Sequence, residues 1–91
     1  MKGVFGVEFS IKVAGEVIQR ERINKNRSQE VLSGFAVMSR SHWSEIEHGH
    51  HPELALQTFW RIANALEMRP SELMRLIEEE TERREREQTE L

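Results

Sequence analysis

The sequence predicts an all-α fold, a compact domain of five helices. Apolar residues recur three and four positions apart in five successive segments from residue 14 onward, which is the spacing of one helix face. Ser28, Ser39 and Pro70 stand at the starts of three of those segments, where serine caps a helix and proline suits its first turn. The chain has 91 residues, of which 37% are hydrophobic, which is enough for one domain with one core.

The first thirteen residues alternate between apolar and polar side chains. The apolar members are Phe5, Val7, Phe9, Ile11 and Val13. This period of two predicts a short, half-buried β-strand. In the alternative, Ser10 caps a helix that starts at Ile11. Because the rest of the chain has helical patterning, the strand would lack a partner in its own domain, and we expect it to pair with its mate in a second copy.

Two helices are predicted next. The first begins near Ala14 and ends in the polar run at residues 24–27. The second starts at Ser28, and Glu30 supplies negative charge against the dipole of its first turn. Their apolar faces consist of Ala14, Val17 and Ile18 in the first helix and of Val31, Leu32 and Phe35 in the second.

Three further helices complete the predicted domain. A break at residues 36–38 precedes the third, which starts after Ser39 and ends near Gly49. A loop containing residues 50–52 leads to the fourth helix, and Pro70 opens the fifth. Their apolar faces consist of Trp43 and Ile46 in the third, of Leu56, Phe59, Ile62, Ala63 and Leu66 in the fourth, and of Leu73, Leu76 and Ile77 in the fifth.

The end of the chain is highly charged. Residues 78–91 hold seven glutamates and three arginines, so this tail carries −4 and residues 1–77 carry +1 of the formal net charge of −3. Glutamate precedes arginine by four positions three times in the tail, a spacing that supports a helix by about 0.2–0.5 kcal/mol per pair. We expect a solvated helical extension that frays. The chain thus divides into an N-terminal arm at residues 1–13, a helical domain at residues 14–77 and a charged tail at residues 78–91.

Residues 28–49 form the candidate functional unit. Two short helices are separated by a three-residue break, and small or polar residues occupy the outer face of the second helix. This is a helix-turn-helix arrangement, in which the second helix enters the major groove of DNA and its first residues reach the base edges. The first helix of the pair crosses the DNA backbone, where its N-terminal amides meet a phosphate.

A wider set of residues carries a family resemblance. It consists of Gly15-Glu16-Val17-Ile18, Ser28-Gln29-Glu30-Val31-Leu32, residues 39–49, Phe59-Trp60-Arg61-Ile62-Ala63-Asn64-Ala65-Leu66 and Pro70-Ser71-Glu72-Leu73. In this register residues 14–77 resemble the repressor-type helix-turn-helix family (XRE/Cro), found in phage repressors and many small bacterial regulators. The resemblance implies a compact five-helix DNA-binding domain. It also implies a dimer that binds two half-sites about 34 Å apart on double-stranded DNA.

The resemblance further implies roles for nine DNA-binding residues. Ser28 and Gln29 would contact phosphates and brace the recognition helix. Arg40 and Ser41 would meet bases, and Arg40 suits guanine through a bidentate pair that discriminates by about 1–3 kcal/mol. Glu45 lies one turn further on, where an acid is repelled unless it accepts a hydrogen bond from a cytosine amino group. The full set is Ser28, Gln29, Ser39, Arg40, Ser41, His42, Ser44, Glu45 and His48, with His42 and His48 beside the backbone.

Five positions carry more specific expectations. Val37 stands where the family prefers glycine in the tight turn, so either the turn differs or about 1–2 kcal/mol of strain is stored there. Glu67 replaces a common glycine after the fourth helix. Trp43 is expected in the core, and Glu47 is expected to hold the helix pair together. Trp60 is expected to be partly exposed or to form a contact surface.

The residue inventory argues against a metal site, a cofactor and catalysis. All four histidines lie within residues 42–51, but their spacing is irregular and no cysteine accompanies them. They are expected to add positive charge near phosphates below about pH 6.5. The chain lacks aspartate, a glycine-rich phosphate loop and a nucleophile elbow, which argues against the common enzyme classes. It shows neither a secretory leader nor a membrane span, so a cytoplasmic location is expected.

The sequence therefore predicts sequence-specific binding of double-stranded DNA by a homodimer that acts as a transcriptional regulator, specifically a repressor. The alternative is a protein-interaction module, such as the antitoxin of a toxin–antitoxin pair. In that case the N-terminal strand or the charged tail would bind the protein partner. Since the acidity belongs mostly to the tail, removing it is expected to tighten DNA binding at low salt.

Overall fold

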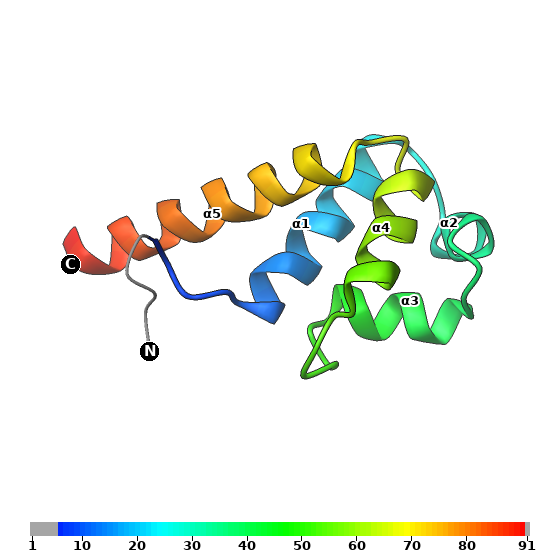
Figure 1. Cartoon of the computed structure of the whole chain (residues 1–91), viewed down its shortest axis with the longest axis horizontal. Helices are drawn as coiled ribbons and strands as arrows, with labels where there is room; N and C mark the ends of the chain where they lie inside the picture. Colours follow the sequence, from blue (N-terminus) through cyan, green and yellow to red (C-terminus); the bar gives the residue numbers. More distant parts are fainter. Residues whose placement is uncertain (1–5, 91) are drawn as a thin grey trace.

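Serine side chains cap the first three helices of the chain. In a computed structural model that describes residues 6–90, the Oγ atoms of Ser10, Ser28 and Ser39 accept hydrogen bonds from backbone amides three residues on, at 3.2, 3.1 and 3.0 Å. The five helices of the described residues are α1 (Ile11–Asn24), α2 (Gln29–Phe35), α3 (Arg40–Glu47), α4 (Leu56–Ala65) and α5 (Pro70–Glu90) (Figure 1). The prediction of an all-α, five-helix domain is confirmed.

The N-terminal strand predicted for residues 4–13 is wrong over the part that the structure describes. Residues 11–13 belong to α1, and residues 7–10 have no strand partner. The alternating apolar side chains do not share a face, because Val13 is buried in the core while Phe9 is 55% exposed. The cap at Ser10 decides the matter, since it starts the helix at Ile11 as the alternative stated. Residues 4 and 5 lie outside the described residues.

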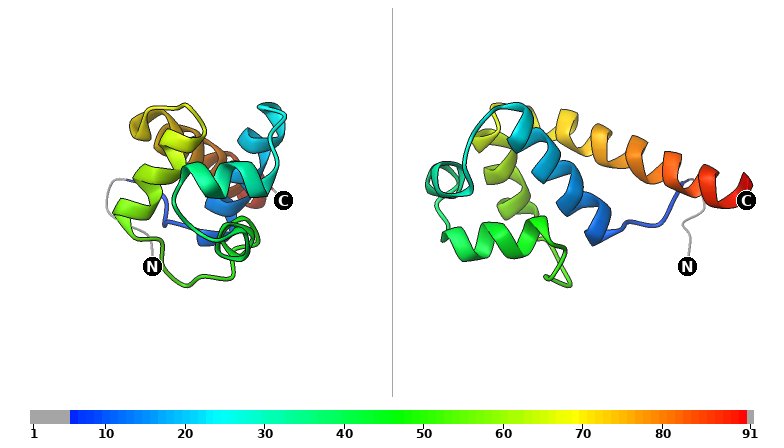
Figure 2. Two further views of the ribbon diagram at one scale, coloured as in Figure 1. Left: turned by 90° about the vertical axis from the view of Figure 1, so that its right-hand side faces the viewer. Right: turned by 180° about the vertical axis from the view of Figure 1, so that it is seen from behind.

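Helix α1 contributes Val13, Ala14, Val17 and Ile18 to the core, which draws buried residues from all five helices. This helix packs against α3 on one side and α5 on the other, while α2 packs against α3 and α4 (Figure 2). Gly15 permits the close approach of α1 to α3, because a Cβ atom there would lie 2.3 Å from the carbonyl oxygen of Ile46. The largest fully buried side chains are Trp43, Ile18, Leu32, Ile46, Ile62, Leu66, Leu73 and Val17.

The first four helices end in the same way. At each C-terminus the residue after the helix cap has left-handed backbone angles. The amides of this residue and of the next one donate hydrogen bonds to carbonyl oxygens of the last turn, which is a Schellman motif. The left-handed residues are Asn26, Val37, Gly49 and Glu67, with φ of 57°, 56°, 69° and 58°. Val37 therefore takes the conformation that favours glycine, and the turn stores the strain that a β-branched residue incurs there.

The charged tail continues α5 without interruption to Glu90. Its first turns do not lie free in solvent: Glu80 pairs with Arg20 at 3.7 Å, and Arg84 pairs with Glu16, so both contacts tie α5 to α1. The predicted spacing of four is present in the pair of Glu80 with Arg84 at 2.8 Å. Figure 1 shows the last turns of α5 projecting away from α2 and α3.

Candidate nucleic-acid interface

The outer face of α3 carries the side chains that the sequence assigned to base reading. Arg40, Ser41 and Glu45 are exposed, and His42 and Ser44 are half-buried. The other face of the helix holds the buried residues Trp43, Ile46 and Glu47. Seven of the nine predicted residues lie between Ser39 and His48, and none of them is buried. A helix with one face anchored in the core thus presents a polar face outward.

The predicted phosphate contacts lie beside the start of α3. Ser28, Gln29 and Arg40 line one open groove of about 620 Å³, together with Arg22 and Glu30. Although Ser28 and Arg40 are twelve positions apart, the turn at residues 36–38 brings the first turns of α2 and α3 to the same groove. The structure therefore gathers the residues assigned to phosphate contact and the arginine assigned to guanine.

A buried carboxylate, Glu47, fixes α3 to the two helices that precede it. Its two oxygens accept from Nε of Arg22 at 2.6 Å and from Nη2 at 3.1 Å, which is a bidentate pair. They also accept from the amide of Gln29 at 2.9 Å and from the indole N–H of Trp43. Burial alone would raise the pKa of Glu47, but these hydrogen bonds and the arginine charge outweigh it and lower the pKa. The carboxylate therefore stays ionised at neutral pH.

The cluster around Glu47 confirms two expected contacts and adds one residue, Arg22, that the sequence analysis did not identify. Glu47 holds the helix pair together, and Gln29 braces the recognition helix by contacting it, both as expected. The DNA contact of Gln29 stays a prediction. The role of Arg22 was missed, because its partner lies 25 positions away and local spacing gives no signal for such a pair. The only hint is an arginine at the polar end of a helix that otherwise packs on the core.

The four histidines form two ring pairs, made by α3, its C-cap and the loop that follows. The rings of His42 and His51 have centroids 4.8 Å apart, and those of His48 and His50 stack at 5.6 Å. Nδ1 of His48 lies 2.7 Å from the carbonyl oxygen of Ser44, and because a carbonyl only accepts, Nδ1 carries the proton. Within residues 6–90 no three histidine or acidic side chains converge in the geometry of a metal site.

The two tryptophans occupy different environments. Trp43 is 1% exposed and belongs to the core, while Trp60 on α4 is 53% exposed, so both expectations are confirmed. Trp60 and two other exposed apolar residues, Leu56 and Met74, line one shallow groove of about 420 Å³ between α4 and α5. We call the surface formed by Leu56, Trp60 and Met74 the α4–α5 face. It is a candidate contact surface separate from the groove at α2 and α3.

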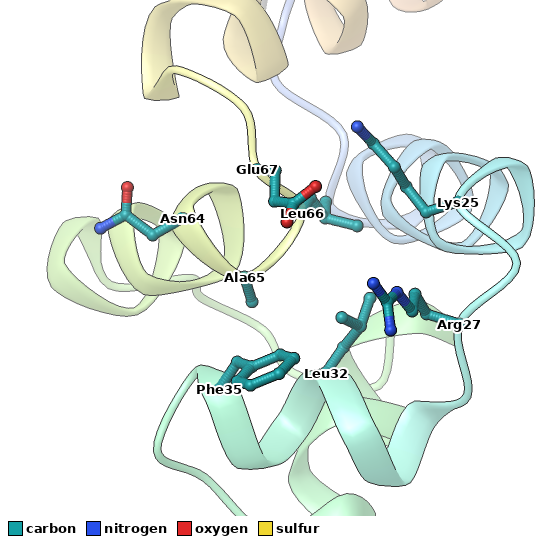
Figure 3. A pocket seen from close by; sticks show the side chains of 8 residues that line it. All are labelled: Lys25, Arg27, Leu32, Phe35, Asn64, Ala65, Leu66 and Glu67. Atoms are coloured by element: carbon teal, nitrogen blue, oxygen red, sulfur yellow. The ribbon is translucent and has the colours of Figure 1, made fainter.

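A smaller cavity of about 250 Å³ lies between α2 and the end of α4. Figure 3 shows Lys25 and Arg27, from the connection between α1 and α2, across the cavity from Asn64 of α4. Its walls otherwise consist of Leu32, Phe35, Ala65, Leu66 and Glu67. Arg27 directly precedes Ser28, so this side of α2 adds two exposed cations next to the residues assigned to phosphate contact.

The fold is shared with solved structures of other proteins, although neither a protein-family model nor a curated protein sequence matches this chain. The restriction-modification controller protein C.AhdI from Aeromonas hydrophila is 28% identical, with a TM-score of 0.66 over 69% of this chain and 94% of that one. The wild-type controller protein C.Esp1396I is 23% identical, with a TM-score of 0.70 over 77% of this chain and 90% of that one.

A third solved structure covers more of this chain. The clp gene regulator ClgR from Corynebacterium glutamicum is 16% identical, with a TM-score of 0.77 over 91% of this chain and 86% of that one. These three proteins are a gene regulator and two controller proteins, which agrees with the resemblance drawn from the sequence. Within the described residues, no helix is both long and apolar enough to cross a bilayer.

Proposed function

We propose that this chain binds double-stranded DNA in a sequence-specific way and represses transcription. In this proposal α3 lies in the major groove and the first turn of α2 lies across the backbone. One observation carries it: Ser28, Gln29 and Arg40 line the same groove, next to a polar helix face whose opposite side is buried. The regulators and controller proteins that share the fold support the same role.

Eight of the nine predicted site residues have the following roles in this proposal. Arg40 reads a guanine, and Ser41 and Ser44 meet neighbouring base edges. Ser28 and Gln29 contact phosphates of the DNA backbone. Gln29 also donates a hydrogen bond to Glu47, so it connects the phosphate contact to α3. Ser39 caps α3 and faces the DNA there, while His42 and His48 lie beside the backbone.

The DNA is bound by a homodimer whose two copies meet through the α4–α5 face. Leu56 and Trp60 are 69% and 53% exposed, an unusual position for two large apolar side chains in one patch. This face takes the place of the N-terminal strand as the dimer contact. A Trp60→Glu variant is expected to sediment as a monomer, whereas Phe35→Glu, an exposed apolar residue on α2, is expected to leave the dimer intact.

The alternative function is a protein-interaction module of the antitoxin type. The α4–α5 face favours it, because a different protein would cover these apolar side chains as well as a second copy does. The N-terminal strand that was expected to bind such a partner is absent from the described residues. The two functions differ in what they require of Arg40.

The experiment that separates them is a binding titration on random-sequence duplex at two salt concentrations. A DNA binder weakens steeply as salt rises, because its cations release counterions from the phosphates. Arg40→Ala is expected to weaken binding at low salt, because it removes a positive charge from the surface proposed to face the DNA. Arg75→Ala is the matched control, since Arg75 is an exposed arginine on α5 paired with Glu79. Absence of binding at low salt, with no effect of Arg40→Ala, would favour the interaction module.

A further inference from the structure

Glu45 is an acid in an unfavourable place. It is the one exposed carboxylate of α3, since the other acid of this helix, Glu47, is buried. If the outer face of α3 enters the major groove, Glu45 lies between two rows of phosphates, where a carboxylate is repelled. Such a residue is tolerated only if it accepts a hydrogen bond from a base, and cytosine offers the N4 amino group for this purpose.

The loop after α3 returns to this carboxylate. Nε2 of His51 lies 3.3 Å from Oε2 of Glu45. This nitrogen is shielded from solvent and makes no hydrogen bond within the described residues, so the ring approaches the carboxylate oxygen without an aligned hydrogen bond. On its other side His51 packs against the ring of His42, with centroids 4.8 Å apart. His51 therefore sits between two outward side chains of α3.

We propose that Glu45 selects one cytosine in the bound sequence and that His51 is the positioning residue for its carboxylate. This inference rests on the proposed function. A carboxylate has two acceptor oxygens and no donor, so it fits the N4 amino group and is repelled by the acceptors of guanine and thymine. Adenine presents an amino group beside the N7 acceptor, which makes it a poorer match. Only cytosine pairs with the carboxylate without an acceptor facing it.

His51 matters because a glutamate side chain has several rotamers in solvent. Ordering such a chain on binding costs free energy, and a contact that already restricts it reduces that cost. His51 supplies the restriction from outside α3, in the loop that follows Gly49, which itself lies so close to α1 that a Cβ atom there would be 3.0 Å from Cα of Lys12. The geometry of the base-reading residue thus depends on a side chain that itself reads no base.

The first test compares base preferences of Glu45 variants by selection from a random duplex pool. Wild type is expected to select at least one C·G pair whose replacement weakens binding about 5–10-fold. Glu45→Gln is expected to shift the preference at that pair towards adenine, which a glutamine amide reads through N6 and N7. Every other selected position is expected to stay unchanged. Glu45→Ala is expected to lose discrimination at that pair alone.

The second test assigns the role of His51 by rescue. His51→Leu is expected to reduce discrimination at the same C·G pair, while His51→Gln, which keeps a polar side chain beside the carboxylate, is expected to restore most of it. His50→Leu is the matched control, because the His50 ring stacks on His48, and its bond to Glu45 runs from the backbone amide to the carbonyl oxygen at 2.9 Å, which leucine keeps. Thermal unfolding of each variant shows whether the fold is intact. A His51→Leu variant with full discrimination would overturn the positioning role.

The outcomes separate this inference from the proposed function. Tight, sequence-selective binding whose preferences are the same in wild type and Glu45→Gln would overturn the cytosine assignment and leave the DNA-binding proposal standing. Loss of all duplex binding in the wild-type chain would overturn both. A shift at one base pair in Glu45→Gln, with binding retained, supports both.

Discussion

Two carboxylate clusters, both tied to α1, differ in what they hold. Glu47 is buried and joins α1, α2 and α3 through Arg22, Gln29 and Trp43. Glu80 lies near the surface of α5, where it pairs with Arg83 and Arg84 of its own helix and with Arg20 of α1. The Glu47 side chain is fully buried and that of Arg22 is only 14% exposed, so the donors depend on the carboxylate, whereas solvent replaces the partners of the second cluster. Charge count alone does not show which cluster orients the proposed recognition helix.

The sharpest contrast is expected from alanine at the two glutamates. Glu47→Ala leaves an arginine, an amide and an indole N–H without their partner, which is expected to destabilise the fold by about 3–5 kcal/mol. Glu80→Ala is expected to cost about 1 kcal/mol or less, because Arg83 and Arg84 are partly exposed. Urea unfolding of the two variants measures the difference. Equal losses would contradict the division between the clusters.

Glycine to alanine tests the helix contact beneath the Glu47 cluster. Gly15→Ala places a Cβ atom 2.3 and 2.7 Å from the carbonyl oxygens of Ile46 and Glu47, so α1 and α3 must separate, at about 1–3 kcal/mol. Gly34→Ala is the control on α2, where no atom lies within 4 Å of the added carbon. It is expected to stabilise the helix by about 0.5–1 kcal/mol. Thermal unfolding should therefore move in opposite directions for the two variants.

Most substitutions to glycine lower the stability of a protein, but one in the turn between α2 and α3 is expected to raise it. Val37→Gly is expected to stabilise the protein by about 0.5–1 kcal/mol, because Val37 has φ of 56° and glycine adopts this region freely. The same change at Val31, in the first turn of α2, is expected to destabilise it by about 1 kcal/mol. A destabilised Val37→Gly variant, measured by urea unfolding, would show that the side chain contributes more than its strain costs.

The smallest effect is expected from the pH dependence of the Glu80 cluster. Hydrogen bonds from Arg83 and Arg84 lower the pKa of Glu80 from 4.5 to about 2. The pKa of Glu80 is lower in the folded state than in the unfolded state. Its contacts with the two arginines therefore stabilise the fold above about pH 4.5, and this stabilisation is lost as the pH falls towards 2. Glu80→Gln should flatten this part of the stability curve, measured by urea unfolding at successive pH values. An unchanged curve would show that the depressed pKa has no effect on folding.

The sequence predicted the helices well because their cause is local. Apolar periodicity and serine caps act within a few positions, and the structure shows both. It also shows left-handed backbone at Val37 and Glu67, where the sequence lacks the expected glycines. The prediction of an N-terminal strand failed because Ile11 and Val13, which end the alternating series, belong to α1, and the cap at Ser10 marks where that helix starts.

The long-range contacts could not be predicted from spacing. The pair of Arg22 with Glu47 and the contact of Arg84 with Glu16 join residues that are neighbours only after the helices pack. For the same reason the tail was expected to be solvated, whereas its first turns contact α1. The DNA contacts of the nine predicted site residues stay predictions, although the structure gathers three of them in one groove and exposes the outer face of α3.

The most direct test of the central claim is amide chemical-shift mapping of the full chain on addition of a selected duplex. The account predicts that the largest shifts fall on residues 28–29 and 39–48, with weaker ones at the cations Lys25 and Arg27. The α4–α5 face should be unaffected once the dimer has formed. Shifts confined to Leu56, Trp60 and Met74, with residues 39–48 unmoved, would contradict it.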